Sequence, residues 1–195
     1  MSVDTVETTS ASISRLRVPG LEELPPKLQN QIESITKQLG YTPNWIRAIA
    51  LGGAHTARFN EYLLPLLDPS QGLLPYADRE ILATVTSAEN GCSYCRLNHA
   101  GSLGEALGDT KLGTRVAIDF KEVRELSPRH RTLAEFAAKL TNHPGEVSDT
   151  DIETLRELGL DDEQIFEAVH VISVFAAANR FTIFLQVTPD DAFFA

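Results

Sequence analysis

Apolar residues recur every three to four positions along most of this chain, and that period constrains the fold more than any other feature. Within residues 25–40 the apolar positions that follow it are Leu28, Ile32, Ile35 and Leu39. Segments with the same pattern span residues 44–67, 76–90, 92–107, 112–125, 128–141, 148–158 and 162–186. Alternating apolar and polar runs, which indicate strands, last only about four or five residues. The pattern therefore predicts an all-α protein.

Glycine and capping residues mark where several of these helices are expected to begin and end. Gly52-Gly53 offers a break within the second segment, and Asn90-Gly91 is a helix-stop and turn signal. Ser148 is a favourable N-cap, with Asp151 three residues on in a capping-box position. Asp161-Asp162 is expected to cap the last long helix.

The chain has 195 residues, a length that suits one domain or two helical halves sharing a core. We expect residues 21–195 to form a single helical domain. Residues 1–20, rich in Ser, Thr and Val without a helical period, are expected to form an arm or tail. The N-terminus shows no basic region followed by an apolar run, and the apolar stretch near residues 169–178 is too short and interrupted to span a bilayer. These features predict a cytoplasmic protein without a membrane partner.

The charge balance excludes some classes of partner. The chain carries 17 basic and 27 acidic residues, which gives a net charge of −10. Nucleic acids and anionic membranes require clustered Lys and Arg, so neither is an expected partner.

The only two cysteines are Cys92 and Cys95. Structural disulfides are rare in the cytoplasm, and a cross-link over so short a loop removes little chain entropy. A chemical role therefore explains the pair better than a stabilising one. Residues three apart on a helix have Cα atoms about 5 Å apart, within the range that a disulfide bridges. The pair can thus alternate between dithiol and disulfide without unfolding the helix.

His99 lies four residues after Cys95 and seven after Cys92, so all three side chains share one helix face. An imidazole there can accept or return a thiol proton near neutral pH. Because the cysteines follow Asn90-Gly91, they lie at a helix start, where unpaired N–H groups and the helix dipole lower a thiol pKa.

Glu80 is the carboxylate that we expect to serve His99. On one continuous helix it would lie roughly 18 Å from Cys92. If Asn90-Gly91 folds the chain into an antiparallel helical hairpin, Glu80 faces the level of His99 and can orient the imidazole. Glu89, three residues before Cys92, is the competing carboxylate and is expected at the solvent-facing end of its helix.

Three other interpretations of the cysteine pair were weighed. Free cysteines are often buried as small hydrophobic residues. Cys92, Cys95 and His99 supply three zinc-type ligands, but a closed structural site needs four, and we expect no metal. A thioredoxin-type site requires a βαβ pattern that the sequence lacks. A redox-inert or metal-binding oligomeric helical module therefore stands as the alternative function.

The residues Arg79-Glu80, the run Asn90-Gly91-Cys92-Ser93-Tyr94-Cys95 and His99 resemble the active-site signature of the alkylhydroperoxidase D-like (carboxymuconolactone decarboxylase-like) family, including its peroxidase-related branch. LGYTPNWIRAIA upstream and FAAANRF downstream, which contains Asn179-Arg180, resemble further segments of that branch. The resemblance implies the family's helical bundle, with the CxxC at the N-terminus of a helix in an antiparallel hairpin. It also implies a homo-oligomer, a trimer or hexamer.

The resemblance further implies a thiol-dependent peroxidase or disulfide oxidoreductase. Cys95 would be the thiol oxidised by a small hydroperoxide, Cys92 its resolving partner, and His99 with Glu80 the proton relay. The best-known members have a histidine where this chain has Tyr94, so Tyr94 is a secondary candidate. Glu89, the competing carboxylate, is another. An external dithiol or protein reductant would reopen the disulfide, and the chemistry requires no cofactor.

Overall fold

The computed structural model describes residues 12–194, and within that range it contains helices and no strand, so the all-α prediction is confirmed. The α-helices are α1 (Pro26–Leu39), α2 (Asn44–Ile49), α3 (Ala54–Leu67), α4 (Tyr76–Glu89), α5 (Ser93–Leu107), α6 (Thr110–Asp119), α7 (Pro128–Asn142), α8 (Asp149–Glu157) and α9 (Asp162–Leu185). Short 3-10 helices are η1 (Leu21–Glu23), η2 (Ala50–Gly52), η3 (Phe120–Glu122), η4 (Pro144–Glu146) and η5 (Asp191–Phe194).

Several predicted boundaries coincide with capping groups in the structure. The segment 44–67 breaks at η2 and Gly53, whose φ of 54° starts α3 in a new direction. Ser148 and Asp151 form the expected capping box of α8. Asp161 caps α9 by accepting a hydrogen bond from the Gln164 N–H. Local sequence chemistry therefore sets these ends.

The predicted N-terminal arm lies partly outside the described residues. Residues 12–20 contain no helix, and Arg15 N donates a 2.8 Å hydrogen bond to the carbonyl oxygen of Leu185. Thr188 N donates similarly to the Ile13 carbonyl at 3.1 Å. This part of the chain therefore runs beside the end of α9.

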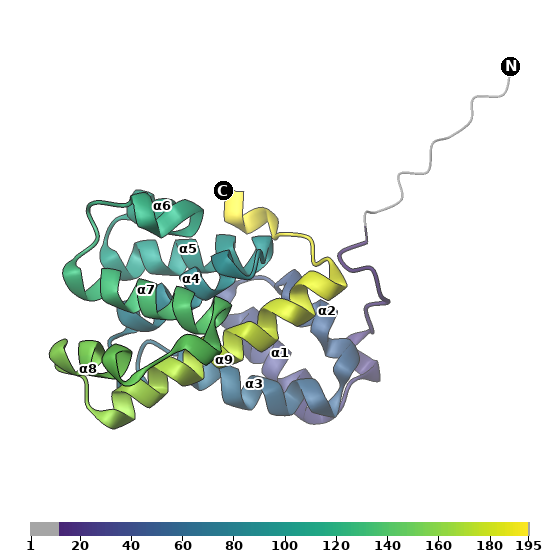
Figure 1. The fold of residues 1–195 in the computed structure, drawn as a ribbon. Coiled ribbons are helices and arrows are strands. Elements are labelled where there is room, and N and C mark those ends of the chain that lie inside the picture. Colours follow the sequence, from purple (N-terminus) through teal and green to yellow (C-terminus); the bar gives the residue numbers. More distant parts are fainter. Residues whose placement is uncertain (1–11, 195) are drawn as a thin grey trace, which may run out of the picture.

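α4 is the central helix of the protein. Every residue from Asp78 to Ser87 is buried, whereas the other helices bury only one face or stripe. α5, α6, α7 and α9 pack around it, and α9 crosses the molecule diagonally between α7 and α8 on one side and α1 to α3 on the other (Figure 1). The main core fills the space between these helices, and a second apolar cluster joins α1 and α2 to the cysteine turn.

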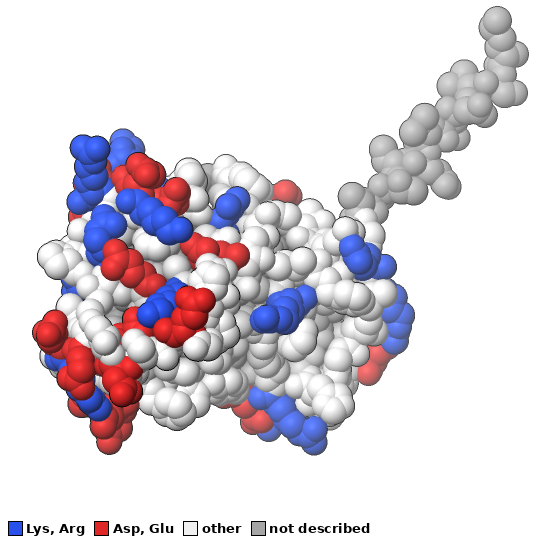
Figure 2. All heavy atoms as spheres, in the orientation of Figure 1, with Lys and Arg blue, Asp and Glu red and all other residues white. Residues whose placement is uncertain are grey.

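α9 is long and apolar enough, by length and composition alone, to cross a membrane. The apolar stretch near residues 169–178, which alone is too short to span a bilayer, thus lies within a helix that continues on both sides of it. Half of the most apolar window of α9 is buried inside the protein, as in the core helix of a globular domain. Charged side chains gather over α6, α7 and α8 on the face in Figure 2, while the surface over the end of α9 is largely uncharged.

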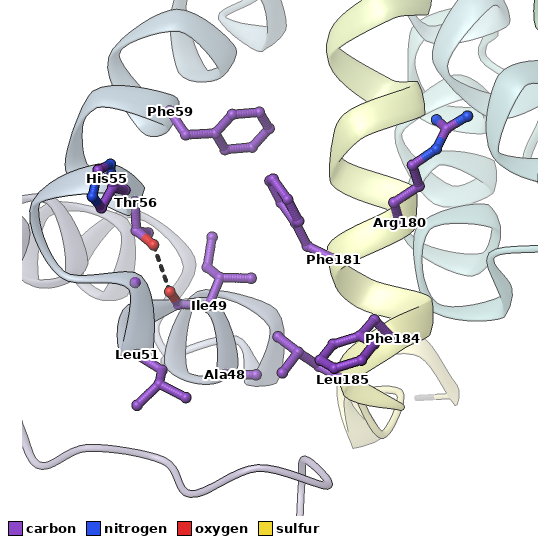
Figure 3. A pocket seen from close by; sticks show the side chains of 11 residues that line it. Ala48, Ile49, Leu51, His55, Thr56, Phe59, Arg180, Phe181, Phe184 and Leu185 are labelled. Atoms are coloured by element: carbon purple, nitrogen blue, oxygen red, sulfur yellow. Dashed lines mark hydrogen bonds between the residues drawn. The ribbon is translucent and has the colours of Figure 1, made fainter.

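An apolar hollow of about 410 Å³ opens between the end of α9 and the helices α2 and α3. Phe181 points from α9 toward Phe59 of α3, with ring centroids 5.3 Å apart, and Phe184 lies nearer the end of the helix (Figure 3). Phe181 and Phe184 are 44% and 59% exposed. The hollow therefore presents aromatic surface to the outside.

α5 and α6 approach so closely that glycine is required at their crossing. A Cβ added at Gly113 would lie 2.6 Å from the Gly104 nitrogen and closer still to the Ala100 carbonyl oxygen. These contacts are with backbone atoms, which cannot move aside as a flexible side chain would.

We expect Gly113→Ala to destabilise the fold by about 2 kcal/mol, because overpacking forces the two helices apart. Urea unfolding followed by circular dichroism measures the change. Gly101→Ala is the matched control on the exposed side of α5, where an added Cβ meets nothing within 4 Å. That control should gain about 0.5–1 kcal/mol, since alanine favours a helix interior. Equal stability of the two variants would contradict the close packing.

Candidate active site

The two cysteines begin α5 as expected from the Asn90-Gly91 turn. Gly91 has a φ of 71°, a left-handed conformation that lets the chain reverse after α4. Cys92 is the N-cap residue of α5, and its sulfur accepts a 3.4 Å hydrogen bond from the Cys95 N–H. Both side chains are free thiols, and Cys92 and Cys95 are only 1% and 5% exposed. The sulfurs therefore share a buried helix start.

The hairpin brings Glu80 of α4 to His99 of α5, as its geometry predicts. The His99 Nδ1 atom lies 2.8 Å from the Glu80 Oε2 atom, and both side chains are buried. A carboxylate oxygen accepts, so Nδ1 carries the proton in this pair and Nε2 is left to exchange one. The Phe175 ring meets the imidazole edge to face at 4.6 Å, and the Asn98 amide nitrogen lies 3.3 Å from Nε2. The imidazole is thus fixed on three sides.

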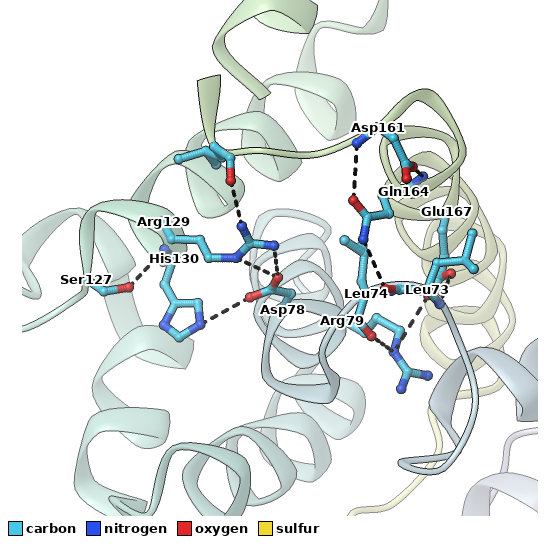
Figure 4. A network of polar contacts seen from close by, with 11 residues as sticks. Leu73, Leu74, Asp78, Arg79, Ser127, Arg129, His130, Asp161, Gln164 and Glu167 are labelled. Atoms are coloured by element: carbon cyan, nitrogen blue, oxygen red, sulfur yellow. Dashed lines mark hydrogen bonds and ion pairs between the residues drawn. The ribbon is translucent and has the colours of Figure 1, made fainter. Parts of the chain in front are cut away.

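The N-terminal turn of α4 is fixed by a second set of buried charges (Figure 4). Arg129 of α7 donates to Asp78 at 2.6 and 2.8 Å, and His130 lies 3.3 Å from the same carboxylate. Burial raises the pKa of Asp78, but the hydrogen bonds from His130 and Arg129 outweigh it and hold the pKa below its usual range. Asp78 therefore stays ionised and ties α4 to α7.

Arg79, the neighbour of Glu80, is fully buried. Its guanidinium donates to the carbonyl oxygens of Leu66, Asp68 and Leu74 at 2.9–3.2 Å and lies 3.7 Å from Glu167 of α9. These contacts close the loop between α3 and α4 over the helix start. They fix the rotation of α4 about its axis, and with it the direction in which Glu80 points.

Asn179 of α9 is a site residue that the sequence did not single out. Its side chain is fully buried, accepts a 2.9 Å hydrogen bond from the Asn90 amide and donates one of 3.1 Å to the Ser87 hydroxyl. It also interacts with the sulfurs of Cys92 and Cys95. Its place in the FAAANRF segment was the available signal, but a lone Asn in an apolar helix carries no spacing that links it to residues 92–95.

The two thiols differ in acidity. The hydrogen bond from the Cys95 thiol, opposed by burial and aided by the Cys95 backbone N–H, holds the pKa of Cys92 below its ordinary range. The hydrogen bond to Cys92, burial and the nearby Cys92 charge raise the pKa of Cys95 well above that range. Of the two thiols, Cys92 is therefore the one that loses its proton more readily.

A cavity of about 510 Å³ gives access to one of these sulfurs. Cys95 and His99 line it, together with Trp45, Leu63 and Phe175, whereas Cys92 is not among the lining residues. The more acidic thiol thus lies behind the thiol that a small molecule meets first.

The secondary candidates lie in different surroundings. The Tyr94 hydroxyl donates to the Asp190 carboxylate and accepts a 3.3 Å hydrogen bond from the Trp45 N–H. Burial, reinforced by Asp190, raises the pKa of Tyr94 well above its usual range, so the phenol stays protonated. Glu89 instead accepts a 2.6 Å hydrogen bond from Asn142 of α7. The structure therefore links Tyr94 to the C-terminal segment and links Glu89, at the end of α4, to α7.

Within residues 12–194 no three His, Cys, Asp or Glu side chains are grouped so that they could hold a metal ion. The His99 Nδ1 atom contacts Glu80, and the two thiols are hydrogen-bonded to each other.

The fold and site together define an all-helical protein whose CxxC thiols share a buried pocket with a Glu–His pair. The solved structure of an uncharacterised peroxidase-related protein from Ralstonia eutropha JMP134, an alkylhydroperoxidase AhpD core, is 30% identical, with a TM-score of 0.87 over 94% of this chain and 95% of that one. A peroxidase-related protein from Silicibacter sp. TM1040 is 27% identical, with a TM-score of 0.84 over 96% and 97%. The chain therefore belongs to the alkylhydroperoxidase D-like family, among its peroxidase-related members.

A more distant structure shares the fold alone. The debrominase Bmp8, solved with 2,3,4-tribromopyrrole, is 15% identical, with a TM-score of 0.73 over 92% of this chain and 95% of that one. Protein-family models and curated proteins gave no match.

The thiol environments generate a prediction about proton affinity. We expect Cys92 in a Cys95→Ser variant to titrate below the ordinary thiol range, because the backbone N–H of residue 95 and Asn179 still stabilise its thiolate. Cys95 in a Cys92→Ser variant should titrate at higher pH, because burial still opposes its charge. Ultraviolet absorbance of the thiolate measures both curves. The reverse order of the two pKa values would contradict the assignment.

Proposed function

We propose that this protein is a thiol-dependent peroxidase that cycles Cys92 and Cys95 between dithiol and disulfide. One observation carries the proposal: Cys95 and His99 line the same cavity, while Cys92 and Glu80 stand directly behind them. A nucleophile next to its resolving partner, and a proton carrier next to the group that orients it, are thus brought to one cavity.

The first step is attack on the O–O bond. The Cys95 thiol passes its proton to the Cys92 thiolate, to which it is hydrogen-bonded, and so becomes the thiolate facing the cavity. It attacks the outer oxygen of the hydroperoxide, forms an S–O bond and breaks the O–O bond. The imidazolium form of His99, with Nδ1 held by Glu80, supplies its Nε2 proton to the leaving alkoxide. The products are an alcohol and a sulfenic acid on Cys95.

The second step closes the disulfide. The Cys92 thiol attacks the sulfenic sulfur and forms the S–S bond, and its proton joins the departing hydroxide to give water. The close approach of the two sulfurs favours this step over further oxidation of Cys95. An external dithiol or a protein reductant then exchanges the bridge open and restores both thiols. Such reductants maintain thiols in the cytoplasm, where we propose the protein works.

The cysteine variants test this cycle. We expect the wild-type protein to consume one hydroperoxide per two thiols lost, and Cys95→Ser to consume none. Cys92→Ser should be oxidised once and leave a sulfenic acid that dimedone traps, because the resolving thiol is missing. Mass spectrometry of the two variants measures each outcome. Normal turnover by both variants would exclude the cycle and favour a redox-inert module.

The same assay separates the two carboxylates. Glu80→Gln should lower kcat/KM about 10- to 100-fold, because the amide no longer fixes the His99 proton on Nδ1. Glu89→Gln is the matched control, since that carboxylate bonds to Asn142. A loss with Glu89→Gln equal to that with Glu80→Gln would contradict the proposed relay.

We also propose that the protein assembles as a homo-oligomer, a trimer or hexamer by resemblance, through the apolar hollow beside α9. Exposed Phe181 and Phe184 form its rim, and contiguous apolar surface of this kind marks association sites (Figure 3). On the face of Figure 2, charged side chains of both signs gather over α6 to α8, and the surface over the end of α9 is largely uncharged.

We expect Phe184→Glu to reduce the molecular mass measured by sedimentation velocity to that of smaller species, because a buried carboxylate opposes the contact. Ile118→Glu on α6 is the matched control, since Ile118 is 72% exposed and lies away from the hollow. A mass unaffected by Phe184→Glu would overturn this surface assignment.

A further inference from the structure

The cavity that leads to Cys95 carries an uneven distribution of charge. Among the described residues that line it, none is Lys or Arg, and Asp68 supplies the only carboxylate. The walls next to the sulfur are apolar or aromatic, while amide side chains, Gln31, Gln38, Gln71 and Asn98, supply most of the polar lining. A substrate therefore meets polar and apolar groups on its way to Cys95, but no cation that would bind a carboxylate.

Asp68 is held in its ionised form by its own turn. Its carboxylate accepts hydrogen bonds from the Ser70 N–H at 2.8 Å, the Ser70 hydroxyl at 2.7 Å and the Gln71 amide at 2.7 Å. The bonds from Ser70, followed by that from Gln71, lower the pKa of Asp68 below its usual value. The side chain is partly exposed and is one of the residues that line the cavity.

The charges behind the cavity wall do not reverse this sign. Arg79 is the nearby cation, and it binds the Asp68 backbone carbonyl at 3.0 Å while lying 3.7 Å from Glu167. Glu80 adds a further carboxylate next to His99. Three acidic side chains, Asp68, Glu80 and Glu167, thus stand against the single guanidinium of Arg79 around this part of the cavity.

We infer that Asp68 is a specificity-determining residue that makes this cavity select uncharged hydroperoxides over anionic ones. The substrate part of the inference rests on the proposed peroxidase activity. A like charge entering a site walled by low-dielectric groups is repelled more strongly than in water, which lowers its rate of arrival. An uncharged hydroperoxide with a compact apolar group fits the walls formed by Trp45, Leu63 and Phe175.

Turnover of a matched substrate pair tests the selectivity. Cumene hydroperoxide carrying a ring carboxylate and its methyl ester have similar shapes and differ in charge. We expect kcat/KM for the ester to exceed that for the carboxylate about tenfold at low salt, as charge repulsion of this kind changes encounter rates. Asp68→Asn should reduce the ratio several-fold, since Asn removes the charge but retains an acceptor for the Ser70 N–H. Glu122→Gln, an exposed change in η3, is the matched control and should leave the ratio unchanged.

Alkylation of the reduced protein separates this inference from the peroxidase proposal. Iodoacetamide and iodoacetate differ mainly in charge, and their rates at the two cysteines, relative to N-acetylcysteinamide, report the field in the cavity without any peroxide. We expect the ratio of the iodoacetamide rate to the iodoacetate rate to be about tenfold larger for the protein than for N-acetylcysteinamide. The preference should shrink near 1 M salt, where the Debye length falls to about 3 Å. A purely structural role of Asp68 would show no such salt dependence.

A second variant guards against local unfolding of the turn in Asp68→Asn. Gln71→Lys keeps a donor for Asp68 and adds a cation to the lining, so it should also reduce the iodoacetamide preference. An unchanged preference in both variants would overturn the inference even if peroxide turnover is observed. A reduced preference without any peroxide turnover would support the charge selectivity and reject the peroxidase proposal.

Discussion

Burial of charge on α4 is the constraint on which the rest of the structure depends. Asp78, Arg79 and Glu80 are consecutive in its fully buried run, and each would cost several kcal/mol if it were left unpaired. α7 provides the cations for Asp78, while α9 and the loop before α4 provide the partners of Arg79. α5 provides His99 for Glu80. The helices around α4 are therefore positioned by the charges they neutralise as well as by the apolar area they cover, and the site is one part of that arrangement.

The cysteine pair shows how position divides two identical side chains into two functions. Cys92 gains acidity from its N-cap position and from the hydrogen bond of its neighbour, but the protein covers it. Cys95 is the less acidic thiol, and it lines the cavity. A proton shared between the sulfurs can reconcile acidity with access, because its transfer from Cys95 to Cys92 moves the negative charge to the side of the cavity. The burial that raises the pKa of Cys95 also limits its oxidation by chance encounters.

The sequence predicted what is encoded locally. Helical period, the Asn90-Gly91 turn and the capping residues near positions 148 and 161 located the helices, and the turn placed Glu80 opposite His99. Contacts between distant segments were not predictable in this way. Asn179 joins the site from 89 residues beyond Asn90, and no spacing rule connects a lone amide in an apolar helix to that turn. The link from Tyr94 to Asp190 depends on where the C-terminal segment packs, and the role of Asp68 in the cavity wall depends on how the loop after α3 folds over Arg79.

α9 contributes to the candidate active site with one face and to the apolar hollow with the opposite face. Its inner face holds Asn179 and Phe175 against the thiols and the imidazole, and its outer face presents Phe181 and Phe184. A helix transmits a tilt or shift along its whole length because its backbone hydrogen bonds resist bending. A contact that shifts Phe181 or Phe184 would therefore also shift Asn179, which interacts with the sulfurs on the other side of the same helix. The outer surface of α9 and the inner side chains beside the sulfurs therefore move together, so a substitution that repacks the outer face also changes the geometry around the thiols.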